Sequence, residues 1–166
     1  MITVISATNR PESMTLKVAQ LYTRLLSEQA TDVQLLSLEG QDIWERGPGL
    51  TALENKYLIP AEKFVFIMPE YNGSFPGVLK MLLDNSDIKK CWWHKKVMLT
   101  GVADGRGGNL RGLEHMTNIL HYLKMHVFYN KIPLSRINEE MDETGKLLKP
   151  ATVEAINEQV NEFLSY

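Results

Sequence analysis

The 166-residue sequence has a single cysteine, Cys91, so no disulfide can form within the chain. Structural disulfides are typical of oxidising compartments, and a lone cysteine favours a reducing, cytoplasmic setting. No apolar run approaches the roughly 20 residues that a membrane-spanning helix needs. The first residues show neither the basic segment nor the cleavage site of a signal peptide. We therefore expect a cytoplasmic protein without a membrane partner.

The sequence also lacks an excess of positive charge. Lys and Arg number 18 against 20 Asp and Glu, which gives a formal net charge of −2. A general nucleic-acid binder needs a basic excess, so we expect no nucleic-acid partner. The spacing of His115, His121 and His126 does not place two ligands on one helical face, so we expect no metal site either. The length fits one domain, residues 1–166.

Strand and helix patterns alternate along the chain. Short apolar or β-branched runs predict five strands, at residues 2–6, 33–38, 63–68, 97–102 and 127–129. Amphipathic stretches predict helices at residues 13–28, 77–89 and 109–125, and one more that begins at Pro150. Residues 50–58 are predicted to form a short helix, and residues 130–149 an irregular excursion with a turn at 143–146.

This alternation predicts an α/β fold, a parallel sheet with helices on both faces. Five strands at this length favour the flavodoxin-like doubly wound sheet with strand order 2-1-3-4-5, and a small Rossmann-type sheet is the alternative. Ligands of such sheets bind beyond the carboxyl ends of the strands, near the point where the strand order reverses. The loops after the first, third and fourth strands are therefore the candidate binding loops.

The first of these loops, residues 6–13, contains no glycine. It is therefore neither a dinucleotide fingerprint nor a phosphate-binding P-loop. It offers Thr8, Arg10 and Ser13, and Thr15 follows in the first turn of the predicted helix. Hydroxyls, a guanidinium fork and a helix N-terminus together suit one phosphate monoester. The alternative is that Ser13 is only an N-cap within an ordinary polar loop.

The second loop, PEYNGSFPG at residues 69–77, holds more special residues than a turn needs. Prolines stiffen both of its ends, and Gly73 lets the backbone approach a flat group closely. Tyr71 offers a ring and Asn72 an amide. A tight strand-to-helix turn is the alternative. The third loop, ADGRGGN at residues 103–109, has glycines that bring backbone near a ligand and an Asn109 placed to cap the next helix.

Together these loops resemble the NADPH-dependent FMN reductase family, a flavodoxin-like group that includes quinone, chromate and azo reductases. The strongest match is Pro69-Glu70-Tyr71-Asn72-Gly73-Ser74, followed by Pro76-Gly77 and Leu79-Lys80. The first loop is similar to the family's Gly-Ser-x-Arg-x-x-Ser, with Ala7 and Thr8 at the first two positions. The third loop is similar to Ser-Gly-Gly-x-Gly-Gly, from which Ala103 and Asp104 depart.

The resemblance implies an FMN site that is shared by the three loops. The first loop would hold the phosphate, the second the polar edge of the isoalloxazine ring, and the third its pyrimidine end. The implied residues are Thr8, Arg10, Ser13, Met14, Thr15, Pro69, Glu70, Tyr71, Asn72, Gly73, Ser74, Ala103, Asp104 and Gly105.

The resemblance also implies an oxidoreductase that passes electrons from NADPH or NADH through FMN to a small-molecule acceptor, such as a quinone, an azo compound, a metal oxyanion or a flavin. The flavin supplies the redox chemistry, so no catalytic side chain is expected, and Tyr71 is a candidate contact for the second substrate. A homodimer or homotetramer is implied, with Trp44 and residues 40–57 as candidates for the contact. The alternative is a flavodoxin-type electron carrier without turnover of its own. Such carriers are usually strongly acidic, so the net charge of −2 and Arg10 favour the enzyme.

Overall fold

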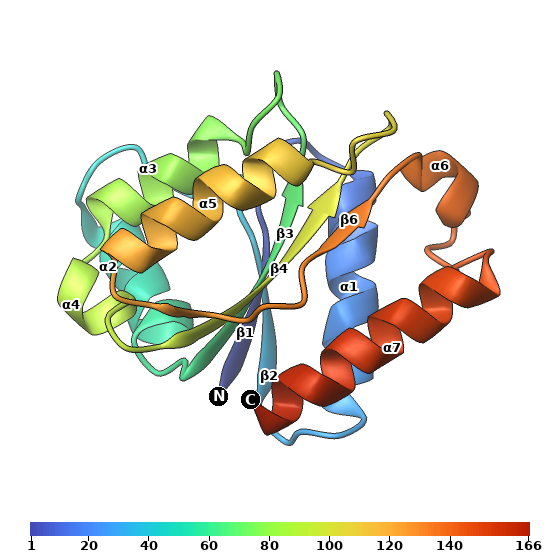
Figure 1. Cartoon of the computed structure of the whole chain (residues 1–166). Coiled ribbons are helices and arrows are strands. Elements are labelled where there is room, and N and C mark those ends of the chain that lie inside the picture. The colour runs from blue at the N-terminus through green and yellow to red at the C-terminus, as the bar shows by residue number, and fades with distance from the viewer.

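A parallel β-sheet runs through the computed structural model, which describes residues 1–166 (Figure 1). The strands are β1 (Ile2–Ser6), β2 (Val33–Ser37), β3 (Lys63–Pro69), β4 (Lys96–Val102), β5 (His126–Val127) and β6 (Ile132–Leu134). Their order is β2-β1-β3-β4-β5, and β6 also pairs with β4. The strand order predicted from the sequence is confirmed, and the sixth strand is an addition to it.

The sheet is buried on both faces. Along β3, Phe64, Phe66 and Met68 face one apolar cluster, whereas Val65 and Ile67 face another. This alternation follows from the two-residue period of a strand, and burial on both sides explains why the run is apolar throughout. The central strand therefore separates the two cores of the molecule.

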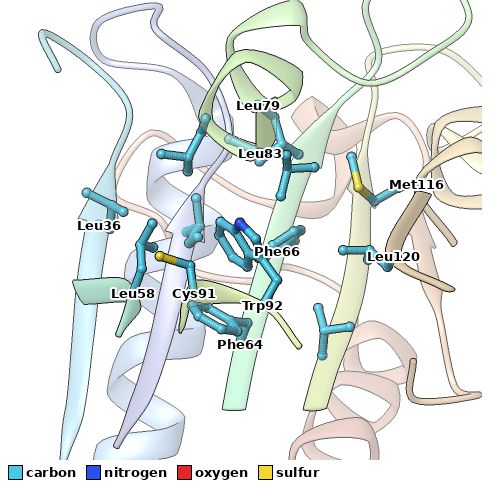
Figure 2. Close-up of a cluster of buried hydrophobic side chains, with 14 of the residues drawn as sticks. Leu36, Leu58, Phe64, Phe66, Leu79, Leu83, Cys91, Trp92, Met116 and Leu120 are labelled. Atoms are coloured by element: carbon cyan, nitrogen blue, oxygen red, sulfur yellow. The ribbon is translucent and has the colours of Figure 1, made fainter. Parts of the chain in front are cut away.

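The first core lies under helices that connect the strands on one side of the sheet (Figure 2). Trp92 is its largest fully buried side chain, and its ring centroid lies 5.0 Å from that of Phe64. The indole Nε1 donates a 2.8 Å hydrogen bond to Ser86 Oγ, which satisfies the polar end of this buried ring. The helices on this side are α2 (Pro48–Leu53), the π-helical segment η1 (Glu54–Leu58), α3 (Gly77–Asn85), α4 (Ile88–Cys91) and α5 (Leu110–Tyr122).

The second core lies under α1 (Met14–Ser27) and α7 (Pro150–Ser165), which cover the opposite face (Figure 1). The short α6 (Ile137–Glu140) lies beyond the carboxyl end of β6. Helices on both faces confirm the predicted doubly wound architecture. No helix combines the length and the apolar character that crossing a bilayer requires.

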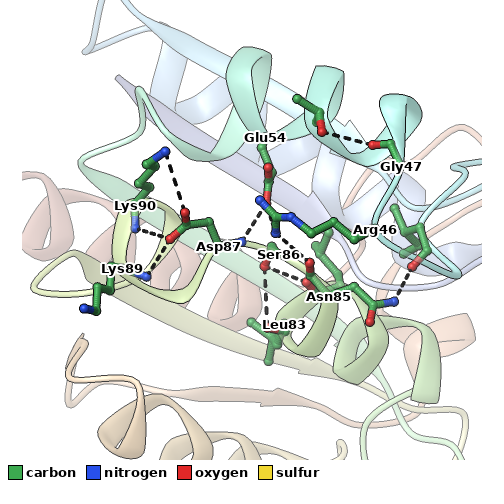
Figure 3. A network of polar contacts seen from close by, with 12 residues as sticks. Arg46, Gly47, Glu54, Leu83, Asn85, Ser86, Asp87, Lys89 and Lys90 are labelled. Atoms are coloured by element: carbon green, nitrogen blue, oxygen red, sulfur yellow. Dashed lines mark hydrogen bonds and ion pairs between the residues drawn. The ribbon is translucent and has the colours of Figure 1, made fainter.

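The helix predicted for residues 77–89 is in fact two helices, α3 and α4, because a polar network interrupts it at Asp87 (Figure 3). The Asp87 side chain accepts hydrogen bonds from the N–H groups of Lys89 and Lys90, so it caps α4. Its own N–H donates to the buried carboxylate of Glu54 at 2.6 Å, and Arg46 Nη1 lies 3.4 Å from the same oxygen. A buried carboxylate needs hydrogen-bond or charged partners. The Asp87 N–H can donate to Glu54 because the helix is interrupted there.

The prediction of an irregular excursion at residues 130–149 is partly wrong, because β6 and α6 lie within it. The fifth strand is also shorter than predicted and ends at Val127. His126 pairs with Lys96, whereas Ile132 pairs with Thr100, so two extra residues bulge out between β5 and β6. The turn predicted at residues 143–146 is confirmed by the Asp142 side chain, which accepts from the N–H groups at both 144 and 146.

A buried amide from α7 occupies this interruption of the sheet. Gln159 Nε2 donates to the carbonyl oxygens of Asn130 at 2.8 Å and of Leu99 at 3.3 Å. Gln159 Oε1 accepts from the Tyr22 hydroxyl at 2.6 Å, and burial raises the pKa of Tyr22 well above its ordinary value. The Gln159 side chain thereby supplies the donor that the missing part of the strand would have supplied.

We expect Gln159→Leu to lower the free energy of unfolding by about 2 to 4 kcal/mol, because the carbonyls of Leu99 and Asn130 lose the Gln159 donor and the Tyr22 hydroxyl loses its acceptor. Urea denaturation of the purified variant measures this loss. Glu154→Gln, at an exposed position of the same helix, is the control and should stay within about 0.5 kcal/mol of the parent chain. Equal stability of the two variants would contradict the role given to Gln159.

Candidate functional site

The three loops chosen from the sequence meet at the carboxyl edge of the sheet, around a cavity of about 240 Å³. Nine of the predicted residues line it, namely Arg10, Ser13, Met14, Thr15, Pro69, Glu70, Tyr71, Ala103 and Asp104. The prediction missed Pro11, Val102 and Ile137. The remaining predicted residues do not line it, namely Thr8, Asn72, Gly73, Ser74 and Gly105.

The first loop leads into the N-terminus of α1. Ser13 Oγ accepts a 3.1 Å hydrogen bond from the N–H of Leu16, so the N-cap interpretation of Ser13 is confirmed. The N–H groups of Met14 and Thr15, in the first turn, donate to no group of the chain. Thr15 is only 3% exposed and lines the cavity. The start of α1 therefore presents backbone donors and a hydroxyl to the cavity, reinforced by the positive end of the helix dipole.

Tyr71 joins the first loop to the second. Its hydroxyl lies 2.5 Å from Thr8 Oγ1, and Arg10 Cζ lies 4.3 Å from the centroid of its ring. The N–H of Arg10 also donates to Thr8 Oγ1 at 3.2 Å. Arg10 pairs with no carboxylate of the chain, so its guanidinium is held by cation–π contact and is free to meet an anion.

The second loop is a hairpin turn. Tyr71 and Ser74 exchange backbone hydrogen bonds of 2.8 and 3.1 Å, and the two residues between them have positive φ, 52° at Asn72 and 77° at Gly73. Positive φ at both central positions is the type I′ turn, for which Asn-Gly is the preferred pair. The turn alternative is thus confirmed for Asn72 and Gly73, and backbone conformation is one reason for the glycine.

Close packing between the third loop and the sheet requires glycine at two positions. A Cβ at Gly108, whose φ is +56°, would lie 2.5 Å from the carbonyl carbon of Pro133. A Cβ at Gly101 in β4 would lie 2.1 Å from the oxygen of Gly108. Gly108 therefore has a packing role, because it lets the loop lie directly on the sheet, and the expectation that the glycines bring backbone to a ligand stays a prediction. Gly105, by contrast, has open space where a Cβ would stand.

Asn109 ties the third loop to the second. Its side-chain Nδ2 donates to the carbonyl oxygens of Met68 and Pro69, both at 3.0 Å, and its N–H donates to Glu70 Oε2 at 3.3 Å. Its side chain forms no hydrogen bond with the N–H groups of α5. The sequence-based expectation that Asn109 caps this helix is therefore only half right, because Asn109 stands at the cap position but its amide holds the end of β3.

Residues beyond β6 close the outer side of the third loop. The N–H of Ile137 donates to the Ala103 oxygen at 3.0 Å, and Asn138 Nδ2 donates to Asp104 Oδ1 at 3.2 Å. Ile137 is one of the residues that line the cavity. No motif in the sequence marked this segment, because its position depends on the pairing of β6 with β4.

Residues 1–139 match the family model described as NADPH-dependent FMN reductase. The chain belongs to the NADPH-dependent FMN reductase family. It is an oxidoreductase of this family, with FMN as cofactor and NAD(P)H as reductant.

Relatives with curated names agree with the family assignment. The NAD(P)H-dependent FMN reductase of Pseudomonas aeruginosa is 26% identical over 139 residues, which cover 81% of this chain and 75% of that protein. The probable NADPH:quinone oxidoreductase 2 of Oryza sativa subsp. japonica is 30% identical over 105 residues, 60% of this chain and 51% of that protein.

Solved structures share the fold of this FMN reductase family member. FerB, a flavoenzyme NAD(P)H:(acceptor) oxidoreductase from Paracoccus denitrificans, superposes with a TM-score of 0.79 at 18% identity, over 99% of this chain and 95% of that one. The apo form of the NADH:FMN oxidoreductase EMOB gives a TM-score of 0.80 at 15% identity, over 99% and 88%. An archaeal flavodoxin gives 0.57 at 11% identity. These likenesses confirm the flavodoxin-like fold.

We expect Gly73→Val to destabilise this family member even without flavin, because a β-branched residue resists the φ of 77°. The free energy of unfolding of the flavin-free protein should fall by about 1 to 2 kcal/mol. Gly73→Asn is the matched control, since asparagine tolerates this conformation, and it should lose less. A stable Gly73→Val protein that fails to bind FMN would show instead that space for the ring, and not φ, requires the glycine.

Proposed function

We propose that residues 1–166 form one FMN-binding domain that passes electrons from NADPH or NADH to a small-molecule acceptor. The observation that carries this proposal is the cavity at the start of α1, where unpaired backbone N–H groups, the Thr15 hydroxyl and the Arg10 guanidinium come together. This donor set has the chemistry of a phosphate site.

The residues of the first loop fit the phosphate of FMN in distinct ways. The N–H groups of Met14 and Thr15 and the Thr15 hydroxyl have no partner in the chain, so they can donate without breaking an existing bond. Arg10 adds charge and a planar fork. Thr8, which the resemblance assigns to the phosphate, has its hydroxyl on Tyr71 and on the Arg10 N–H. We therefore assign Thr8 to holding Tyr71 and Arg10 in place.

The residues of the other two loops fit the polar part of the isoalloxazine ring. The N–H groups of Glu70, Tyr71 and Ser74 are already bonded to carbonyl oxygens of the chain. The N–H groups of Asn72, Gly73, Asp104 and Gly105 form no such backbone hydrogen bond. We propose that these four N–H groups are the donors available to the ring and that Pro69, Ser74 and Ala103 shape the loops that present them.

When bound, FMN supplies the two-electron redox chemistry, and the protein supplies position. Tyr71 has its hydroxyl on Thr8 and one ring face under Arg10, so its neighbours favour a positioning role over contact with a second substrate. The acceptor that we propose first is a quinone, because one curated relative is named for that activity. Azo compounds, metal oxyanions and free flavin are to be tested beside it.

We also propose that the protein assembles as a homodimer or homotetramer. Trp44 is 65% exposed and Tyr122, on α5, is 81% exposed, which is unusual for large aromatic side chains. Asn85 Nδ2 donates to the Trp44 oxygen at 3.1 Å and so holds the loop of Trp44 against the end of α3. An exposed aromatic residue on a fixed loop is suited to contact with a second copy.

The purified protein, supplied with FMN, should oxidise NADPH or NADH rapidly when a benzoquinone is present and should reduce the quinone in equal amount. Stopped-flow absorbance measures both changes. A protein that binds FMN but oxidises neither nucleotide would be an electron carrier of the flavodoxin type, and a protein that binds no flavin at micromolar FMN would contradict the whole proposal.

Arg10→Ala should weaken FMN binding by about 10- to 100-fold, the loss expected for one charge-assisted hydrogen bond, and riboflavin binding much less. Quenching of flavin fluorescence measures both affinities. Thr15→Val keeps the shape of a buried side chain but removes its hydroxyl, so it should weaken FMN selectively without lowering the stability of the flavin-free protein. Equal losses for FMN and riboflavin in Arg10→Ala would mean that Arg10 acts through Tyr71 and not on the phosphate.

A further inference from the structure

A second cavity, of about 420 Å³, adjoins the first. The two meet at Glu70, which lines both. The other lining residues come from the third loop and from the first turn of α5, and they are Gly105, Arg106, Gly107, Leu110 and Arg111. This second cavity is not needed to hold the phosphate of FMN, for which the start of α1 already provides donors.

The second cavity is basic. Arg106 and Arg111 are both exposed, and neither forms an ion pair within the chain, whereas Arg46 and Arg136 do. The carboxylate of Glu70 is engaged by the N–H of Asn109 at 3.3 Å. The nearby carboxylate of Asp104 accepts from Asn138 at 3.2 Å. Two guanidinium groups therefore border this cavity outside any ion pair, and with the single carboxylate of Glu70 in the lining the cavity has a net positive charge.

The position of Arg111 relates this charge to the proposed flavin site. Its Nη1 lies 3.7 Å from the point where a Cβ of Gly73 would stand, so the guanidinium reaches the tip of the hairpin. Asn72 and Gly73 at that tip are the residues that we assign to the edge of the flavin ring. An anion held by Arg111 would thus lie beside the hairpin tip, next to the proposed flavin site.

The lining indicates which group would bind. Leu110 is the single hydrophobic residue among the six that line the cavity, so it offers little to an uncharged aromatic acceptor. Two arginines suit a phosphate, because each planar fork can donate two parallel hydrogen bonds to its oxygens. NADH and NADPH share a pyrophosphate, and NADPH has a further phosphate on the 2′ position of its adenosine ribose.

We propose that Arg106 and Arg111 bind a phosphate group of the nicotinamide dinucleotide and so set the affinity of the enzyme for its reductant. The proposal rests on the proposed function, since it takes the first cavity as the FMN site. If the bound group is the 2′-phosphate, the two arginines determine the preference for NADPH over NADH. If it is the pyrophosphate, they determine the affinity for both nucleotides.

The test measures steady-state kinetics of Arg106→Ala, Arg111→Ala and the double variant with NADPH and with NADH. The KM for NADPH should rise about tenfold or more for each arginine, the loss expected for a charge-assisted hydrogen bond, with little change in kcat. A rise confined to NADPH identifies the 2′-phosphate, and equal rises for both nucleotides identify the pyrophosphate. Arg111→Lys, which keeps the charge but loses the fork, should fall between the parent and Arg111→Ala.

Arg24→Ala is the matched control, because Arg24 is an exposed and unpaired arginine in the last turn of α1. It removes the same charge away from the cavity and should leave both KM values unchanged. The affinity for FMN should be unchanged in all variants. If FMN affinity falls in parallel with the rise in KM, the arginines support the loops and the proposal is wrong.

A second measurement does not depend on turnover. Calorimetric titration of the full chain with adenosine 2′,5′-bisphosphate and with ADP should show binding of at least one of them, weakened by Arg106→Ala and Arg111→Ala but not by Arg24→Ala. Binding that is absent, or the same in all variants, overturns the proposal. Failure of the proposed function has a different signature, because the parent chain would then bind no FMN or oxidise neither nucleotide.

Discussion

The hydrogen bonds of Asn109 fix the carboxyl edge of the sheet, and the binding loops depend on them. The Asn109 amide holds the carbonyl groups of Met68 and Pro69 where β3 ends, and its N–H meets the carboxylate of Glu70. Its left-handed backbone, with φ of 62°, is a conformation that asparagine accepts better than most residues. One residue thus sets where the third loop ends, where α5 begins and where the hairpin leaves the sheet.

The hairpin of the second loop also holds the first loop in place. Tyr71 follows Glu70, and its hydroxyl and ring contact Thr8 and Arg10. The contacts thus run from the third loop through the second to the first, and all are made by the chain itself. Loops that hold one another in this way lose little conformational freedom when a ligand arrives, which favours binding.

The sequence was sufficient to predict the strand order and the three loops, because burial on two faces makes the strands apolar runs and the binding edge follows from topology. The sequence was not sufficient where contacts with residues distant along the chain determine the local structure. The break between α3 and α4 depends on Glu54, and the need for glycine at 108 depends on Pro133. The Asn72-Gly73 pair is itself a sequence signal for a type I′ turn, independent of any ligand contact at this loop.

The least predictable part of the site is the wall formed beyond β6, and its position follows from the bulge in the fifth strand. Side chains of a strand point alternately to its two faces. An insertion of two residues therefore leaves the side chains of β6 pointing to the same faces as they would without the bulge. Phe128, Ile132 and Leu134 accordingly all pack with the core under α1 and α7. The insertion leaves backbone carbonyls at the interruption, and Gln159 satisfies those of Leu99 and Asn130. A buried amide on α7, remote from the cavity, therefore stabilises the strand whose continuation brings Ile137 to the cavity wall.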